Sequence, residues 1–147
     1  MTRTVRLLGA LALFGGGYLA GTQGKTPIAS AAQGAGSERV FELRTYTAHP
    51  GKNPDVIRRF RDHTAYLFAK NGMQNIAYFV PTDTPQSQNT LIYIIAHPSR
   101  EAAQANWARF RADSAWVRAR TASEANGPIV MRTQSVFMKA THFSPIQ

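Results

Sequence analysis

The chain has 147 residues, 44% of which are hydrophobic, and it contains no cysteine. A chain of this size can bury the core of one domain, and the lack of cysteine excludes disulfides, thiolate nucleophiles and cysteine-based zinc sites. The formal net charge of +9 comes from basic residues scattered among acidic ones, with no long run of lysine or arginine. We therefore expect no nucleic-acid partner and attribute the charge to surface arginines.

Residues 1–32 are predicted to be a secretory signal peptide. Arg3 and Arg6 precede an uncharged, mostly apolar run at residues 7–20, and residues 29–31 (Ala-Ser-Ala) offer a cleavage site. The apolar run is short for a membrane span. We expect export to the periplasm or beyond, and the alternative is an uncleaved N-terminal anchor as the only contact with a membrane.

A flexible linker is predicted at residues 33–38 and the folded domain at residues 39–147. The domain opens with an alternating strand at residues 39–47. Asn53 and Pro54 predict the start of a helix that stops at Asn71-Gly72.

Two strands follow, at residues 73–80 and 90–96, and the second is apolar on both faces, as in a central strand. Ser99 is predicted to cap a second helix, and Asp113 to recap a further helical piece. The last strand is expected at residues 129–139.

The order β-α-β-β-α-β predicts a ferredoxin-like α+β fold, an antiparallel sheet with helices on one face and strand order 4-1-3-2. His49-Pro50 and His97-Pro98 each follow a strand and precede a helix. Taking the first and third strands as parallel neighbours, we expect these two histidines at the same end of the sheet.

The face of the sheet without helices also needs a cover, because it is expected to be largely apolar. The residues assigned to it are Val40, Tyr46, Ile76 or Phe79, Tyr93 and Val136. The simplest cover is a second copy across a two-fold axis. We therefore expect a homodimer that encloses a barrel-like cavity.

Three stretches resemble the NIPSNAP family. They are Phe41-Glu42-Leu43-Arg44-Thr45-Tyr46, then Arg59 to Thr64 with Leu67-Phe68 and Asn71-Gly72-Met73, and finally Trp107, Phe110, Asp113 and Trp116 in sequence. The resemblance implies a dimeric α+β barrel, a superfamily that includes cofactor-independent monooxygenases, haem-binding dismutases and small cyclases. The family itself has no generally assigned reaction.

The first strand carries the most distinctive candidate site residues. Glu42, Arg44 and Tyr46 share one face of it, because side chains alternate along a strand. We assign Phe41 and Leu43 to the helix-covered face, which places the other three in the cavity or the dimer seam. Glu42 and Arg44 can pair there, either as a structural ion pair or with Arg44 binding an anionic or carbonyl group beside the Tyr46 phenol.

His63 lies at the edge of the first helix's apolar stripe. It is a candidate general base or haem ligand, and the alternative is an ordinary boundary histidine. Tyr78, Tyr93 and Arg132 are candidate ligand-binding residues of the cavity. His49 and His97 lack supporting ligands, so we predict no metal site and no cofactor.

Three functions remain open at this point. The first is a non-catalytic module that binds a small apolar or aromatic ligand. The second is a cofactor-independent monooxygenase or isomerase in which His63 acts as base and Arg44 stabilises an anion, with Tyr46 at the same site. The third, a haem protein, requires a histidine that faces the cavity.

Overall fold

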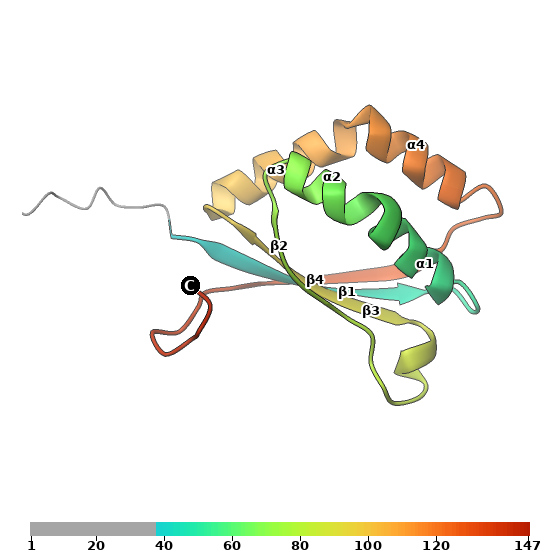
Figure 1. The fold of residues 1–147 in the computed structure, drawn as a ribbon, viewed down its shortest axis with the longest axis horizontal. Coiled ribbons are helices and arrows are strands. Elements are labelled where there is room, and N and C mark those ends of the chain that lie inside the picture. The colour runs from blue at the N-terminus through green and yellow to red at the C-terminus, as the bar shows by residue number, and fades with distance from the viewer. Residues whose placement is uncertain (1–37) are drawn as a thin grey trace, which may run out of the picture. The chain divides into compact units, whose positions relative to one another are not determined.

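A computed structural model describes residues 38–147 (Figure 1). The predicted leader, and all of the linker except residue 38, lie outside the described residues. The elements, in chain order, are β1 (Val40–Ala48), α1 (Asn53–Arg59), η1 (Phe60–Thr64), α2 (Ala65–Lys70), β2 (Gln74–Phe79), η2 (Gln86–Gln88), β3 (Thr90–His97), α3 (Arg100–Ala112), α4 (Ser114–Ser123) and β4 (Val130–Met138).

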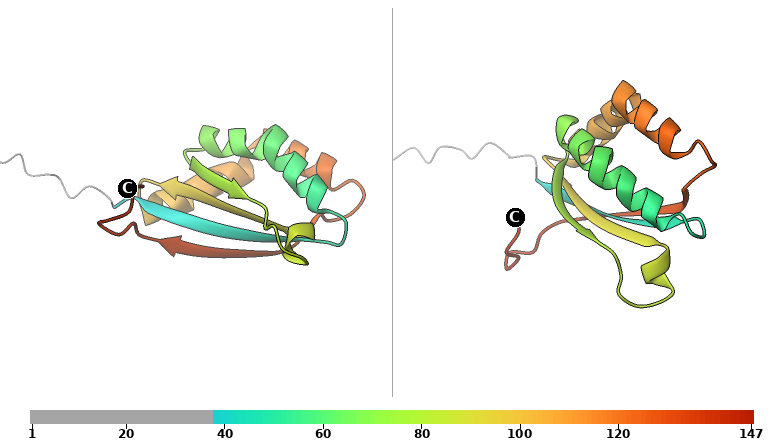
Figure 2. Two further views of the ribbon diagram at one scale, coloured as in Figure 1. Left: turned by 60° about the horizontal axis from the view of Figure 1, so that its bottom comes forward. Right: turned by 45° about the vertical axis from the view of Figure 1, so that its right-hand side comes forward.

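The strands form one sheet in the order β2-β3-β1-β4, with helices over one of its faces (Figures 1 and 2). This confirms the predicted ferredoxin-like α+β fold and its strand order. Every neighbouring pair is antiparallel. The prediction that the first and third strands run parallel is wrong, because in this fold each helical crossover joins strands that another strand separates. Val40 pairs with His97, so His49 and His97 lie at opposite ends of the sheet.

The first helix is continuous from Asn53 to Lys70, but its middle turn is a π-turn. The Ala65 N–H donates to the carbonyl of Phe60, five residues earlier, and the Thr64 hydroxyl donates to the carbonyl of Arg59 at 3.2 Å. A π-turn accommodates one residue more than an α-helical turn. The helix ends as predicted at Asn71-Gly72, where Gly72 has φ +85°.

Helices α3 and α4 meet at Asp113, whose extended backbone breaks the helix. Its carboxylate accepts a hydrogen bond from the Ala115 N–H at 2.9 Å, which confirms the predicted recapping. The same carboxylate contacts Lys70 at 2.8 Å and Asn71 at 3.1 Å, so it also joins the break to the end of α2.

Aromatic rings fill the space between the sheet and the helices. Tyr93 is fully buried there and contacts the rings of Tyr46 at 5.4 Å, Phe60 at 5.0 Å and Phe68 at 5.7 Å between centroids. Edge-to-face and tilted contacts of this kind stabilise a core beyond the area they bury.

The assignment of faces on β1 is reversed by the structure. Glu42, Arg44 and Tyr46 point toward the helices, as the ion pair and ring contacts below show, and Phe41 and Leu43 point toward the open face. A buried carboxylate is tolerated on the helix side because hydrogen bonds satisfy it. Val40, Tyr46 and Tyr93 are therefore wrongly assigned to the open face.

Part of the open face is apolar nonetheless. Leu43 lies opposite Ile94 and Val136 on the two neighbouring strands, and Ile92 lies opposite Phe79. Phe79 is 52% exposed and Val136 55% exposed. At one end, the segment after β4 contributes to a cover: Ala140 and Ile146 line a small cavity with Phe41.

Candidate functional site

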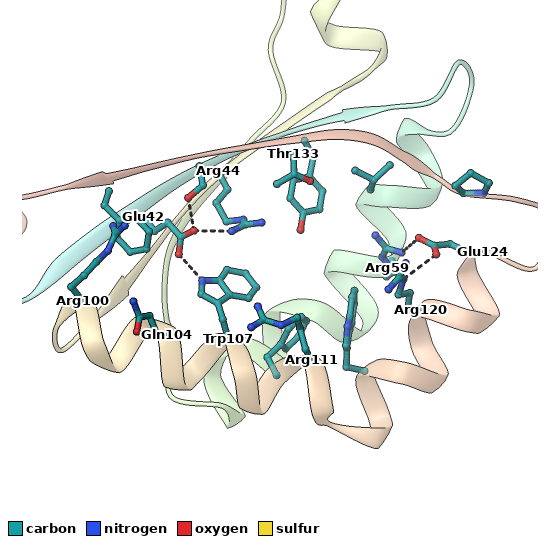
Figure 3. Close-up of a pocket in the computed structure, with 17 residues that line it drawn as sticks. Glu42, Arg44, Arg59, Arg100, Gln104, Trp107, Arg111, Arg120, Glu124 and Thr133 are labelled. Atoms are coloured by element: carbon teal, nitrogen blue, oxygen red, sulfur yellow. Dashed lines mark hydrogen bonds and ion pairs between the residues drawn. The ribbon is translucent and has the colours of Figure 1, made fainter.

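A cavity of about 690 Å³ lies between the sheet and helices α3 and α4 (Figure 3). We call it the central pocket. Strands β1 and β4 form one wall, the two helices form the opposite wall, and Arg59 of α1 contributes from one side. A volume of this size is typical of a small-molecule site.

Glu42 is buried in one wall of the central pocket with 1% of its surface exposed. Its Oε1 accepts hydrogen bonds from Arg44 Nη1 at 2.7 Å and from the Ser135 hydroxyl at 2.6 Å. Its Oε2 accepts from Trp107 Nε1 at 2.7 Å and contacts His97 Nε2 at 3.3 Å. Burial alone raises the pKa of Glu42, but these four partners outweigh burial and lower it from 4.5 to about 2.

The orientation of His97 follows from its other neighbour, Asn106. The Asn106 amide nitrogen donates to the carbonyl of Gly72 at 2.7 Å and lies 3.2 Å from His97 Nδ1, while its oxygen accepts from Arg109. Nδ1 is therefore an acceptor and Nε2 donates to Glu42. His97 is a buried support for Glu42 and does not line the central pocket.

Arg44 extends from β1 into the central pocket (Figure 3). Its guanidinium lies 4.3 Å from the ring centroid of Trp107 and 5.7 Å from that of Tyr46. Within the part of the chain that the structure describes, its side chain makes one hydrogen bond, from Nη1 to Glu42, and its buried Nε has no partner. Because the Arg44 side chain lines the central pocket, its other Nη donors are available to a ligand.

The other end of the central pocket holds a second arginine and glutamate. Arg59, with 4% of its surface exposed, donates from Nη1 to Glu124 at 2.9 Å and to the Ser123 hydroxyl at 3.2 Å. Glu124 also accepts from Arg120 at 3.1 Å. The guanidinium of Arg59 lies 5.2 Å from the ring centroid of Trp116.

The charge of the lining is strongly positive. Five arginines and two glutamates line the central pocket, an excess of three positive charges. Both glutamates are already bonded to arginines. The balance favours an anionic ligand over a cationic one.

The structure brings together Glu42, Arg44 and Tyr46, three of the seven predicted site residues. Tyr93 is buried behind Tyr46, and burial raises its pKa well above 10. Tyr78 stacks on the far side of Tyr93 and donates to Asn75 at 2.7 Å, and burial raises its pKa to about 12. Neither lines the central pocket.

The other two predicted residues lie outside the central pocket. His63 is exposed and lines a separate, smaller hollow with residues of α4 such as Ala119 and Ser123. Arg132 lies opposite Thr47 and therefore on the open face. Among the described residues, no histidine lines the central pocket, so the structure does not support His63 as its base or haem ligand.

Several residues of the site were not predicted from the sequence. Ser135, Glu124 and Arg59 have no local signature, because each gains its meaning from an element distant in the chain. Trp116 could have been identified from its spacing, because on one continuous helix it would point away from the face that carries Trp107. The break at Asp113 turns it back toward the same pocket.

No helix within residues 38–147 has the length and hydrophobicity that crossing a bilayer requires. This part of the chain also brings no three histidine, aspartate or glutamate side chains together as metal ligands.

Fold and central pocket together define a ferredoxin-like α+β domain with a ligand-sized cavity between its two layers. The NIPSNAP family model matches residues 41–145, and the chain therefore belongs to the NIPSNAP family. The resemblance drawn from the sequence is confirmed. No curated protein sequence matches the chain.

Solved structures share the fold at low sequence identity. A NIPSNAP family protein of unknown function from Agrobacterium tumefaciens is 20% identical, with a TM-score of 0.64 over 75% of this chain and 95% of that one. A NIPSNAP-like domain protein from Burkholderia xenovorans is 18% identical, with a TM-score of 0.64 over 74% and 90%. SnoaB, a cofactor-independent oxygenase from Streptomyces nogalater, is 16% identical, with a TM-score of 0.50 over 74% and 99%.

Proposed function

We propose that this protein binds a small, largely aromatic ligand in the central pocket and that Arg44 holds an anionic group of that ligand. The observation that carries the proposal is the state of the Arg44 guanidinium. It lies close to the rings of Trp107 and Tyr46, it lines a cavity of about 690 Å³, and among the described residues only Glu42 accepts a hydrogen bond from it.

Glu42 supports this role by orienting Arg44. Four donors already surround its carboxylate, and its pKa of about 2 makes it a weak base. It therefore serves to hold Arg44 and Trp107 in place, while the positive excess of the lining attracts the ligand. The aromatic rings of Trp107, Phe110 and Trp116 supply an apolar surface for its body.

The proposal includes a homodimer formed through the open face of the sheet. That face presents Leu43, Ile92, Phe79 and Val136 without helices over them. Exposed apolar surface of this extent marks an interaction site, and a second copy presents the same surface across a two-fold axis.

The second candidate is a cofactor-independent monooxygenase or isomerase acting in the same pocket. The observation that favours it is the shared fold with SnoaB across 99% of that oxygenase. In this chain Arg44 would stabilise the anion of the substrate. Because the described lining contains no histidine and Glu42 is a weak base, such a substrate must be acidic enough to ionise without a strong protein base.

The proposal is tested by titrating the protein with 2-naphthoate and with its neutral analogue naphthalene-2-carboxamide. Both tryptophans of the sequence, Trp107 and Trp116, line the central pocket, so intrinsic fluorescence and calorimetry together report binding there. We expect the carboxylate to bind more tightly than the amide. Arg44→Gln should weaken the carboxylate about 10- to 100-fold, the value of one charged hydrogen bond, and should leave the amide unchanged.

Arg132→Gln is the matched control, because Arg132 lies on the open face and should not affect either ligand. Equal affinity of the carboxylate for the wild type and Arg44→Gln would overturn the proposal. Oxygen uptake, followed with an electrode while bound acidic ligands are present, separates the oxygenase from a binding module.

A further inference from the structure

We infer that the central pocket selects ligands with two anionic groups, one at each end of an apolar body. The inference rests on the proposed function and names the class of ligand more closely. It assigns the second group to Arg59 and Arg120 at the end of the central pocket opposite Arg44 (Figure 3).

The two ends have the same construction. At one end Glu42 bonds Arg44, which lies over Trp107 at 4.3 Å. At the other end Glu124 bonds Arg59, which lies over Trp116 at 5.2 Å. Each unit places a guanidinium over an indole ring and bonds one of its nitrogens to a carboxylate.

Both arginines retain unused donors. The Nε atoms of Arg44 and Arg59 are buried and have no hydrogen-bond partner within the described part of the chain. In each side chain, Nη1 makes all the hydrogen bonds to residues 38–147. The Nη2 groups also make no hydrogen bond within that part of the chain, and because both side chains line the central pocket, these are the donors that we assign to the ligand.

An aromatic wall connects the two ends. The ring of Phe110 lies 5.7 Å from that of Trp107 and 4.5 Å from that of Trp116. Figure 3 shows Arg44 and Arg59 toward opposite ends of the central pocket, so we assign a separate anionic group to each. A planar apolar body that lies along this wall places one acidic group near each arginine.

The net charge of the far end supports a second anion. Glu124 is shared between Arg59 and Arg120, which leaves one positive charge. Burial raises the pKa of Glu124, but the hydrogen bonds from the two arginines outweigh burial and lower it overall. Arg111 also lines the central pocket and makes no hydrogen bond to the described residues. The far end therefore attracts an anion without first losing an ion pair.

Matched pairs of acids test the inference by calorimetry. Each pair has one apolar body: 2-naphthoate with naphthalene-2,6-dicarboxylate, and biphenyl-4-carboxylate with biphenyl-4,4′-dicarboxylate. We expect at least one diacid to bind about tenfold or more tightly than its monoacid, equivalent to about 1.4 kcal/mol. The double variant Arg111→Gln/Arg120→Gln removes two positive charges from the lining, so both acids should bind more weakly. The diacid should lose at least tenfold more affinity than its monoacid, which abolishes the preference.

Arg118→Gln is the control, since Arg118 lies on α4 with Arg120 but does not line the central pocket. Arg59→Gln is a second far-end variant, whose folding is checked by circular dichroism. If the monoacids bind through Arg44 and no diacid binds more tightly, the inference is wrong and the proposed function stands. If the preference survives all far-end substitutions, the assignment to Arg59 and Arg120 is wrong. If no acid binds, the proposed function fails as well.

Discussion

Glu42 accepts two hydrogen bonds at each carboxylate oxygen, and this arrangement makes the stability of the protein depend on pH. Its folded pKa of about 2 lies below the ordinary value of 4.5. The stabilisation is therefore fully present above about pH 4.5 and is lost as the pH falls toward 2. This difference between the ordinary and the folded pKa corresponds to about 3 kcal/mol in the free energy of unfolding.

The prediction at the residue scale compares the wild type with Glu42→Gln by urea unfolding between pH 2 and pH 7. The variant should be less stable at pH 7, because an amide presents a donor where the pocket offers only donors. The difference between the two proteins should shrink by about 3 kcal/mol at low pH. A difference that stays constant with pH would show that Glu42 does not titrate as described.

Residue patterns alone established which side chains share a face of β1 but not which face meets the helices. Phe41 and Leu43 look like core residues, and Glu42 and Arg44 look like surface residues. The helix-facing position of Glu42 depends on Trp107, Ser135 and His97, which come from three other elements. Only the folded arrangement shows that these donors converge.

At the scale of elements, the junction of α3 and α4 turns both tryptophans toward the central pocket. Asp113→Ala removes the side-chain cap of α4 and its contacts with α2. We expect a loss of about 1–2 kcal/mol in the free energy of unfolding. Asp113→Asn should recover most of it, since an amide oxygen still caps the helix and the exposed ion pair with Lys70 contributes little.

Ser114→Ala is the control for this pair, because Ser114 is the exposed first residue of α4. If Asp113→Asn is as unstable as Asp113→Ala, the ion pair and not the cap dominates.

Caps such as Ser99 and Asp113, and the stop at Gly72, were predictable because they depend on neighbouring residues. The π-turn was not, because it reflects packing across the whole helix.

At the scale of the molecule, the order of strands followed from hydrophobic patterning and from the family resemblance. The central pocket did not, because its two ends combine residues as distant as Arg59 and Glu124. The proposed dimer also belongs to this scale, because a second copy would cover the apolar part of the open face.

Light scattering with size-exclusion chromatography tests the dimer. We expect a dimer for the wild type, and for Val136→Glu a dimer Kd raised by at least tenfold, because a charge buried unpaired in an interface costs on the order of 2–5 kcal/mol. Val117→Glu is the matched control: Val117 is 49% exposed, but it lies on α4, away from the open face. A monomeric wild type, or a Val136→Glu variant that stays dimeric, would contradict this assembly.

The π-turn at Phe60–Thr64 has a consequence for any change in the length of the first helix. Deleting one residue within it would restore a regular α-helix and turn the preceding segment by about 100° around the helix axis. The Leu67 and Phe68 side chains anchor the part that follows. Arg59 would then rotate away from Glu124 and Trp116. The position of the second arginine of the central pocket thus depends on the number of residues in this turn. Under the proposed function, an insertion or deletion here would remove the arginine assigned to the second anionic group.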